Sequence, residues 1–361
     1  MRCVGVGMAA ALFAAAAWAQ DVRPREMPAN LDASRVTVDV KDARAGDVAR
    51  KLAEEAGNRP AQVMDRAALP VTLALKDAPY WEAVVALRRA AAGRRDPADR
   101  DVEACLGPVY LRVYSITRVR HLRSVDPGGT RNYALLFGTL EWESRLPVRG
   151  MEVWLTSLVG SDGRERIDDY GTKGPRRVGY GAYLEGASEN FDVYVARPPD
   201  DSVLKTCEGH VLMELAAGER AAVIDEPRTP GPDFAKNGDF SVRLDKSWFY
   251  GKTFVVTTTM RVEGDATWPP LGAGYGPTLV GKDGKARPGL VTTGAPSLRD
   301  KFEALAPPAA DGAKRPAREF QISFRFDDLP PADGPWALRW VLPEDHRIRR
   351  LPFTLADVPL R

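Results

Sequence analysis

The stretch VTVDVKDA at residues 36–43 returns 35 positions later as VTLALKDA at residues 71–78. Each copy alternates apolar and polar residues, which is the period of a half-buried strand. A helical period follows each copy, over residues 46–56, where Gly57 ends the helix, and over residues 80–92. The repeat therefore predicts two strand-helix units in tandem.

Residues 61–64 (AQVM) predict one more short strand between the first helix and the second repeat copy, so the expected order over residues 30–95 is βαββα. The repeat copies, with LAEEAG at residues 52–57 and EAVVAL at residues 82–87, resemble the secretin and TonB receptor short N-terminal (STN) domain. That resemblance implies a periplasmic module that contacts other components of the envelope. No secretin pore or outer-membrane barrel follows in this sequence, so the resemblance supports the periplasmic address rather than a role in transport.

The rest of the chain has strand patterns with turn signals every eight to twelve residues, which favours antiparallel sandwiches. The segment LVGSDGR at residues 158–164 is echoed by LVGKDGK at residues 279–285, and both read as a strand entering an Asp-Gly hairpin. We expect two copies of one Ig-like sandwich, over residues 104–225 and 236–361. The Pro-rich residues 226–235 are expected to link them.

The predicted fold class is therefore mainly β with a small α+β module, the two sandwiches being tandem antiparallel β-sandwich domains. Over its whole length the chain resembles exported planctomycete-type proteins that join an STN-like module to β-sandwich repeats. The residues that carry this resemblance are YWEA at 80–83, LRVYSITR at 111–118 and PFTLADVPL at 352–360. The resemblance implies an architecture and no established activity.

The first residues have the pattern of a secretory signal peptide. Arg2 precedes an apolar stretch over residues 4–19, which ends in Ala-Trp-Ala and predicts cleavage after Ala19. The alternative is a retained membrane anchor, but the run is short and only mildly hydrophobic. With residues 1–19 removed we expect no membrane span and a periplasmic protein, with secretion or cell-surface display as alternatives.

The charge balance argues against a nucleic-acid partner. The chain of 361 residues has 51 Lys and Arg against 49 Asp and Glu, a formal net charge of +2, and both signs are interspersed. Nucleic-acid binding normally requires a basic face, and no basic block occurs.

Motifs of catalysis and metal binding are absent from the sequence. There is no Gly-x-Ser-x-Gly and no His- or Cys-based metal spacing. The histidines are His121, His210 and His346, and the adjacent acid pairs stand at 168–169, 200–201 and 327–328. Adjacent acids on a strand point to opposite faces, so they cannot act together on one bond. We expect no catalytic residue, no metal site and no cofactor.

Aromatic residues give the main hint of a binding surface. Trp248, Phe249, Tyr250 and Trp268 fall in the second predicted sandwich. Exposed rings on a β face are a common platform for sugars or partner chains, whereas the alternative is that these rings are core.

Cys105 and Cys207 remain after the signal peptide, which also removes Cys3. A single pair outside the cytoplasm permits one intramolecular disulfide, and these two residues precede the first and last strands of the first sandwich. We expect a disulfide between them. Two buried free thiols are the alternative.

Taken together, these features predict a non-enzymatic periplasmic interaction or scaffold protein with envelope proteins as partners. The alternative is a carbohydrate-binding or carbohydrate-cleaving protein of the cell surface with a polysaccharide partner.

Overall fold

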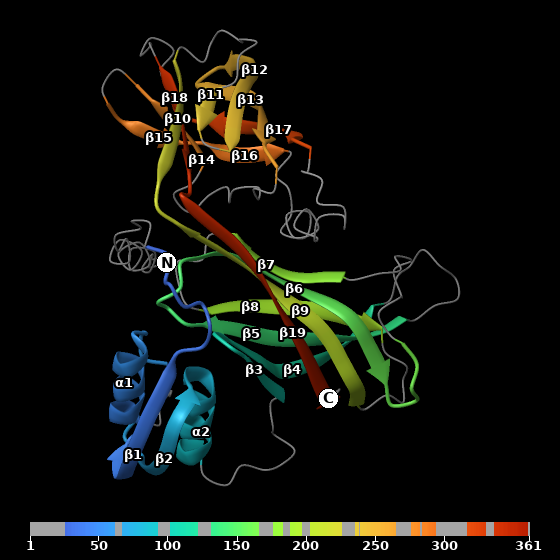
Figure 1. Cartoon of the computed structure of the whole chain (residues 1–361). Coiled ribbons are helices and arrows are strands. Elements are labelled where there is room, and N and C mark those ends of the chain that lie inside the picture. The colour runs from blue at the N-terminus through green and yellow to red at the C-terminus, as the bar shows by residue number, and fades with distance from the viewer. Residues whose placement is uncertain are drawn as a thin grey trace, which may run out of the picture.

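The structure is a computed structural model that is mostly β, with its strands in antiparallel sheets. It describes residues 26–61, 67–92, 102–121, 131–165, 176–182, 188–196, 203–225, 235–237, 239–264, 276–281, 284–293, 316–329 and 336–359. The predicted signal peptide, residues 1–19, lies outside these ranges. A helical module and a second sandwich lie at opposite ends of the molecule, with a first sandwich between them (Figure 1). No helix in the described ranges is long and apolar enough to span a membrane.

The N-terminal module contains β1 (Arg35–Arg44), α1 (Ala45–Ala56), β2 (Pro70–Pro79) and α2 (Tyr80–Ala92). The strands pair antiparallel, and the helices pack their apolar residues against them in one core. Both helices match the predicted ranges, and Gly57 ends α1 in the left-handed region with φ 65°. Of the additional strand predicted at residues 61–64, Ala61 is in no strand and residues 62–64 lie outside the described ranges.

The sequence repeat of the module is also a repeat of its backbone. Asp42 and Asp77 occupy equivalent positions, each with positive φ (51° and 50°) at an irregularity in the β1–β2 pairing. The Asp42 N–H donates to Thr72 Oγ1 at 3.3 Å, and the Asp77 N–H donates to Thr37 Oγ1 at 3.1 Å. Asp is one of the few residues that tolerate this conformation, so the repeated Lys-Asp-Ala has a conformational reason.

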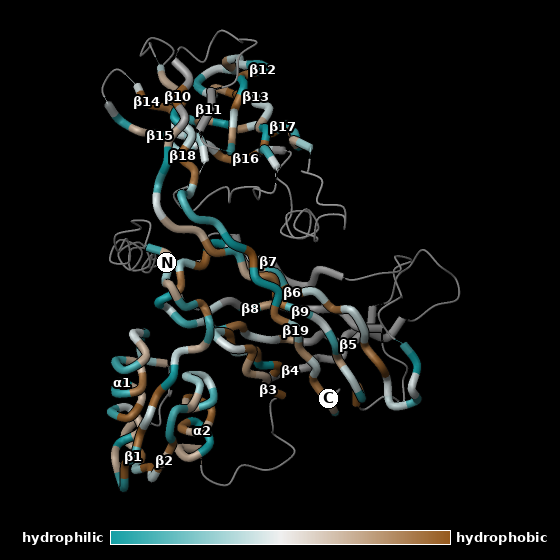
Figure 2. The backbone as a smooth tube through the Cα atoms, in the orientation of Figure 1, coloured by the Kyte–Doolittle hydropathy of each residue, from teal (hydrophilic) through white to brown (hydrophobic). Residues whose placement is uncertain are grey.

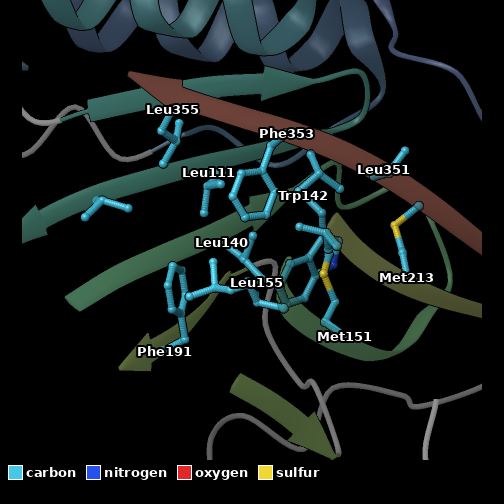
Figure 3. Close-up of a cluster of buried hydrophobic side chains, with 14 of the residues drawn as sticks. Leu111, Leu140, Trp142, Met151, Leu155, Phe191, Met213, Leu351, Phe353 and Leu355 are labelled. Carbon is cyan, nitrogen blue, oxygen red and sulfur yellow. The ribbon is translucent and has the colours of Figure 1, made fainter. Parts of the chain in front are cut away.

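The first sandwich encloses the largest core between two four-stranded sheets, ordered β3-β4-β5-β8 and β19-β9-β6-β7. Its strands are β3 (Val102–Leu106), β4 (Val109–His121), β5 (Arg131–Trp142), β6 (Val148–Gly160), β7 (Arg176–Ala182), β8 (Ser188–Ala196), β9 (Val203–Ala217) and β19 (Asp345–Pro359). Figure 3 shows side chains of both sheets meeting in this core, among them Leu111, Leu155 and Phe353.

The second sandwich has a four-stranded sheet, β10-β18-β14-β15, and a five-stranded sheet, β11-β12-β13-β17-β16. Its strands are β10 (Arg220–Asp225), β11 (Ala235–Asn237), β12 (Phe240–Tyr250), β13 (Thr253–Val262), β14 (Gly276–Val280), β15 (Ala286–Pro288), β16 (Leu290–Thr293), β17 (Arg318–Phe326) and β18 (Ala337–Leu342). A separate apolar core lies between these sheets.

The two sandwiches share one topology. The order β3-β4-β5-β8 corresponds to β11-β12-β13-β17, and the order β19-β9-β6-β7 corresponds to β10-β18-β14-β15. The two Asp-Gly hairpins also match, because Gly160 N–H donates to Arg164 O at 2.9 Å and Gly281 N–H donates to Lys285 O at 3.3 Å. The repeated hairpin sequences thus correspond to a repeated structure.

The sandwiches exchange their outer strands, which the expected domain boundaries missed. Strand β9 continues into β10, which pairs with β18 of the second sandwich, and β18 continues into β19, which pairs with β9 of the first. The prediction that residues 236–361 form the second sandwich was therefore wrong for residues 345–359. The physical reason is that the apolar side of β19, which includes Phe353 and Leu355, fills the first core.

The crossing points also differ from the predicted linker. The chain enters the second sandwich just after Ala217 and returns just before Asp345, whereas residues 226–235 connect β10 to β11 within the second sandwich. Residues 226–234 lie outside the described ranges.

We call residues 203–225 and 337–359 the exchange ribbon. Its register is constant, from Val203 opposite Pro359 to Asp225 opposite Ala337. At the crossing, Glu344 N–H donates to Ala217 O at 3.0 Å and continues the ladder. The start of β19 is hydrophilic, and the ribbon runs diagonally from the second sandwich across the first (Figures 1 and 2).

A buried carboxylate joins the module to the first sandwich. Glu143 is 0% exposed and accepts hydrogen bonds from Ser34 N–H at 2.9 Å, from Ser34 Oγ at 2.7 Å and from Arg145 Nε at 2.6 Å. Arg145 also donates to the backbone carbonyls of Asn30, at 2.7 Å, and Asp32. We call this group the Glu143 joint.

Aromatic packing adds a second contact between the same parts. Trp81 of α2 stacks on Tyr110 of β4 with ring centroids 5.5 Å apart, and its Nε1–H donates to Pro108 O at 3.0 Å. Arg88 donates to Glu141 at 2.9 Å beside these rings. The module is therefore fixed to the sandwich.

The strand exchange predicts which core depends on the C-terminal strand. We expect Phe353→Ala to destabilise the first sandwich by about 3–5 kcal/mol, because it leaves a cavity between its sheets. Hydrogen exchange measured by mass spectrometry should show faster exchange in β4, β5 and β6 and unchanged exchange in β12 and β13. Faster hydrogen exchange confined to the second sandwich would contradict the assignment of β19 to the first sandwich.

The Glu143 joint predicts that removing the charge of Glu143 lowers the stability of the fold. We expect Glu143→Gln to lower the free energy of unfolding in urea by about 1–3 kcal/mol, because the amide group turns a donor toward Ser34 or Arg145. Glu54→Gln, at an exposed position on α1, is the matched control and should change little. Equal stability of both variants would show that the joint needs no carboxylate.

Candidate binding face

The outer face of β12 and β13 presents aromatic side chains because of a bulge. Val242 and Leu244 point into the second core, and Leu244 stands opposite Thr258. Asp245 is an extra residue, so that Lys246 stands opposite Thr257. An inserted residue reverses which side chains face the core. Downstream of the bulge, Trp248 therefore points outward.

A row of outward-facing residues crosses four strands of this face, three of them apolar and one, Arg325, charged, and we call it the aromatic row. Trp248 on β12 pairs with Val255 on β13, Val255 pairs with Arg325 on β17, and Arg325 pairs with Leu290 on β16. Tyr250 lies two residues beyond Trp248 on the same side of β12. The exposed fractions are 46% for Trp248, 82% for Tyr250 and 53% for Leu290.

The predicted aromatic surface is thus only partly realised. The structure brings Trp248 and Tyr250 together on one face. Phe249 points inward instead, with its ring 4.6 Å from that of Phe254, so its inclusion was wrong. Trp268 lies outside the described residues. Leu290 was missed because only strand pairing, through Arg325 and Val255, places it in one row with Trp248.

Polar rows flank the aromatic row on both sides. On one side Thr257 Oγ1 lies 3.0 Å from Ser323 Oγ, next to the exposed Lys246. On the other side, Asp327 accepts a hydrogen bond from Thr253 Oγ1 at 3.0 Å and forms an ion pair with Arg325, whose Nε lies 3.0 Å away. The face therefore combines exposed rings with hydroxyl and charged groups, and one of the charged groups, Arg325, lies within the row.

Asp245 holds the bulge in place. Its carboxylate accepts hydrogen bonds from Thr259 Oγ1 at 2.6 Å, Gln321 Nε2 at 3.0 Å and Arg243 Nε at 3.1 Å. Burial acts to raise the pKa of Asp245, but these hydrogen bonds and the nearby guanidinium outweigh it and hold the pKa below its usual range. The bulge is thus tied to β13 and β17.

The predicted disulfide is not formed, and both cysteines are free. Alternation along β3 turns Cys105 toward the module core, whereas Cys207 of β9 lies in the core between the two sheets. The side chains are therefore on opposite sides of a sheet. Burial raises the pKa of Cys105 to about 11 and that of Cys207 to about 12, so both thiols stay protonated at neutral pH.

The described histidine side chains, those of His210 and His346, lie on strands and are buried or hydrogen-bonded, as structural residues are. His346 shares a 2.8 Å hydrogen bond with Glu214, and His210 is buried on the same strand as Glu214. The side chain of His121 and the pairs at 168–169 and 200–201 lie outside the described residues. Within the described ranges no three His, Cys, Asp or Glu side chains form a group able to hold a metal ion.

Comparison with known proteins adds little. No protein-family model and no curated protein matches the chain. Among solved structures, one described as the crystal structure of the conserved domain protein from Bacillus anthracis is similar at 9% identity and a TM-score of 0.21. The match covers 72% of this chain and 89% of that chain. A likeness this low carries no argument about fold or function.

The hydrogen bonds of Asp245 predict a pH-dependent stability. Its lowered pKa in the folded state means that its contribution is present above the unfolded value of about 3.9 and is lost as pH falls through the folded value. Asp245→Asn should cost about 1–2 kcal/mol at pH 7, and the difference from wild type should shrink below about pH 4 in urea unfolding curves. Asp239→Asn, at an exposed position, is the control. A difference that is constant from pH 3 to 7 would contradict the ionic role.

Proposed function

We propose that the protein is a non-enzymatic interaction protein of the bacterial envelope, which works in the periplasm and binds a partner through the aromatic row. The observation that carries this proposal is the exposure of Trp248, Tyr250 and Leu290 on one sheet face. Trp and Tyr are the residues that most often dominate binding energy at interfaces.

The clustering of these residues is informative. Five large apolar side chains are exposed in the described part of the chain, and three of them belong to this face. Trp248 and Tyr250 are neighbours on one side of β12, and Leu290 lies across Val255 and Arg325 from Trp248. Single exposed apolar residues need no explanation, whereas neighbouring exposed rings with polar groups around them mark an interaction site. Of the other two, Leu69 lies just before β2 in the module and Val223 lies on β10, in the other sheet of the second sandwich.

The arrangement of the three parts suits an adaptor. The Glu143 joint fixes the module to the first sandwich, and the exchange ribbon fixes the second sandwich to it. The second sandwich, which carries the aromatic row, and the module lie at opposite ends of the molecule (Figure 1), an arrangement that leaves room for a separate partner at each end. The resemblance of the module to STN domains, the Ig-like sandwiches and the signal peptide at residues 1–19 support an envelope setting.

Carbohydrate binding is the second candidate function. The hydroxyl groups of the half-buried Thr253 and Ser323 beside exposed rings favour it, since sugars combine apolar ring faces with hydroxyl groups. In this candidate function the aromatic row is again the binding surface, and its ligand is a carbohydrate instead of a protein.

An affinity experiment tests whether the aromatic row is the binding surface. The tagged protein is used to capture partners from a solubilised envelope extract that includes polysaccharide, with protein identified by mass spectrometry and sugar by composition analysis. We expect Trp248→Ala with Tyr250→Ala to reduce capture about tenfold or more, because it removes two exposed anchors. Val223→Ala, an exposed apolar change on β10, is the matched control and should leave capture unchanged. Equal capture by all three proteins would refute the proposal.

A further inference from the structure

We infer that the aromatic row is a binding site for a neutral polysaccharide chain, an inference that rests on the proposed function of this face. The row supplies three elements of such a site: exposed rings, flanking hydroxyl groups and a guanidinium, that of Arg325, already paired with a carboxylate. Each is visible in the described residues of β12, β13, β17 and β16.

The shape of the aromatic row fits a linear ligand. From Trp248 to Leu290 the row crosses three strand spacings, about 14 Å at roughly 4.8 Å each, with Val255 and the charged Arg325 between its ends, and it is one residue wide except at Tyr250. A protein partner usually buries a broad patch with an apolar centre. A sugar chain needs a strip on which its C–H faces can stack, with hydrogen-bonding groups alongside.

The flanking side chains supply those hydrogen-bonding groups. The half-buried Ser323, hydrogen-bonded to the buried Thr257, lies on one side of the row, and the half-buried Thr253 lies on the other. A hydroxyl both donates and accepts, so Ser323 and Thr253 can each bond a sugar hydroxyl while keeping their protein partners. The sheet fixes their spacing before the ligand arrives, which reduces the entropy lost on binding.

The charged side chain within the row, Arg325, is already paired, and the exposed Lys246 stands on one flank. Arg325 is paired with Asp327 at 3.0 Å, Arg243 with Asp245 at 3.1 Å, and Arg261 with Glu263 at 2.7 Å. An acidic polysaccharide would have to displace Asp327 from Arg325 and leave that carboxylate beside its own. A neutral chain accepts hydrogen bonds from the guanidinium without breaking the ion pair.

Native gel electrophoresis through soluble polysaccharide provides the test. The full chain, after signal removal, is run in gels that contain hydroxyethylcellulose, galactomannan or dextran as neutral probes and alginate as the acidic probe. We expect retardation by at least one neutral gel, and dissociation constants about tenfold weaker for Trp248→Ala and for Tyr250→Ala. Val223→Ala should bind as wild type does, and thermal unfolding should confirm that all variants are folded.

The outcomes separate this inference from the proposed function. Retardation by no neutral gel, equal retardation of wild type and Trp248→Ala, or stronger retardation by alginate overturns the polysaccharide inference. If capture of an envelope protein still depends on Trp248 and Tyr250, the proposed function stands with a protein as the partner. If capture does not depend on them either, both fail.

Discussion

The molecule depends on one hydrogen-bonded ribbon, formed by residues 203–225 and 337–359. Each sandwich receives its outer strand from the other copy, so neither four-stranded sheet is complete without the chain passing through both. An exposed sheet edge with a missing strand would leave a row of unpaired backbone groups and an open core. The exchange satisfies those groups in both sandwiches at once, and it couples two apolar cores that have no shared residue.

The ribbon and the Glu143 joint together set the geometry on which function depends. A flexible linker would let the second sandwich sample many orientations, and binding would then have to order them at an entropic cost. A two-stranded connection with an unbroken register restricts these orientations, and the buried bonds of Glu143 do the same for the module. A face at one end and a module at the other are thus presented in a fixed relation.

Local features could be predicted from the sequence because they depend on neighbours in the chain. The period of the apolar residues gave both helices, Gly57 marked a helix end, and the Asp-Gly pairs marked equivalent hairpins. Non-local features could not. The alternation of Leu351, Phe353 and Leu355 shows that one side of β19 is buried, but either sandwich can bury it. Likewise, alternation does not tell which side of β3 is the inside, and the predicted bond from Cys105 failed for that reason.

At the candidate site, too, the sequence alone does not determine which side chains are exposed. Three adjacent aromatic residues on a strand must alternate between core and solvent, and the sequence does not say which of them points outward. Continued from Leu244 without interruption, the pleat would bury Trp248 and Tyr250 and expose Phe249. The single inserted residue at Asp245 reverses this outcome, and its bonds to Thr259 and Gln321 hold the reversal in place. Asp245 is therefore a positioning residue for the aromatic row although it belongs to neither flank of it: the exposure of the rings follows from a carboxylate that fixes the phase of the strand.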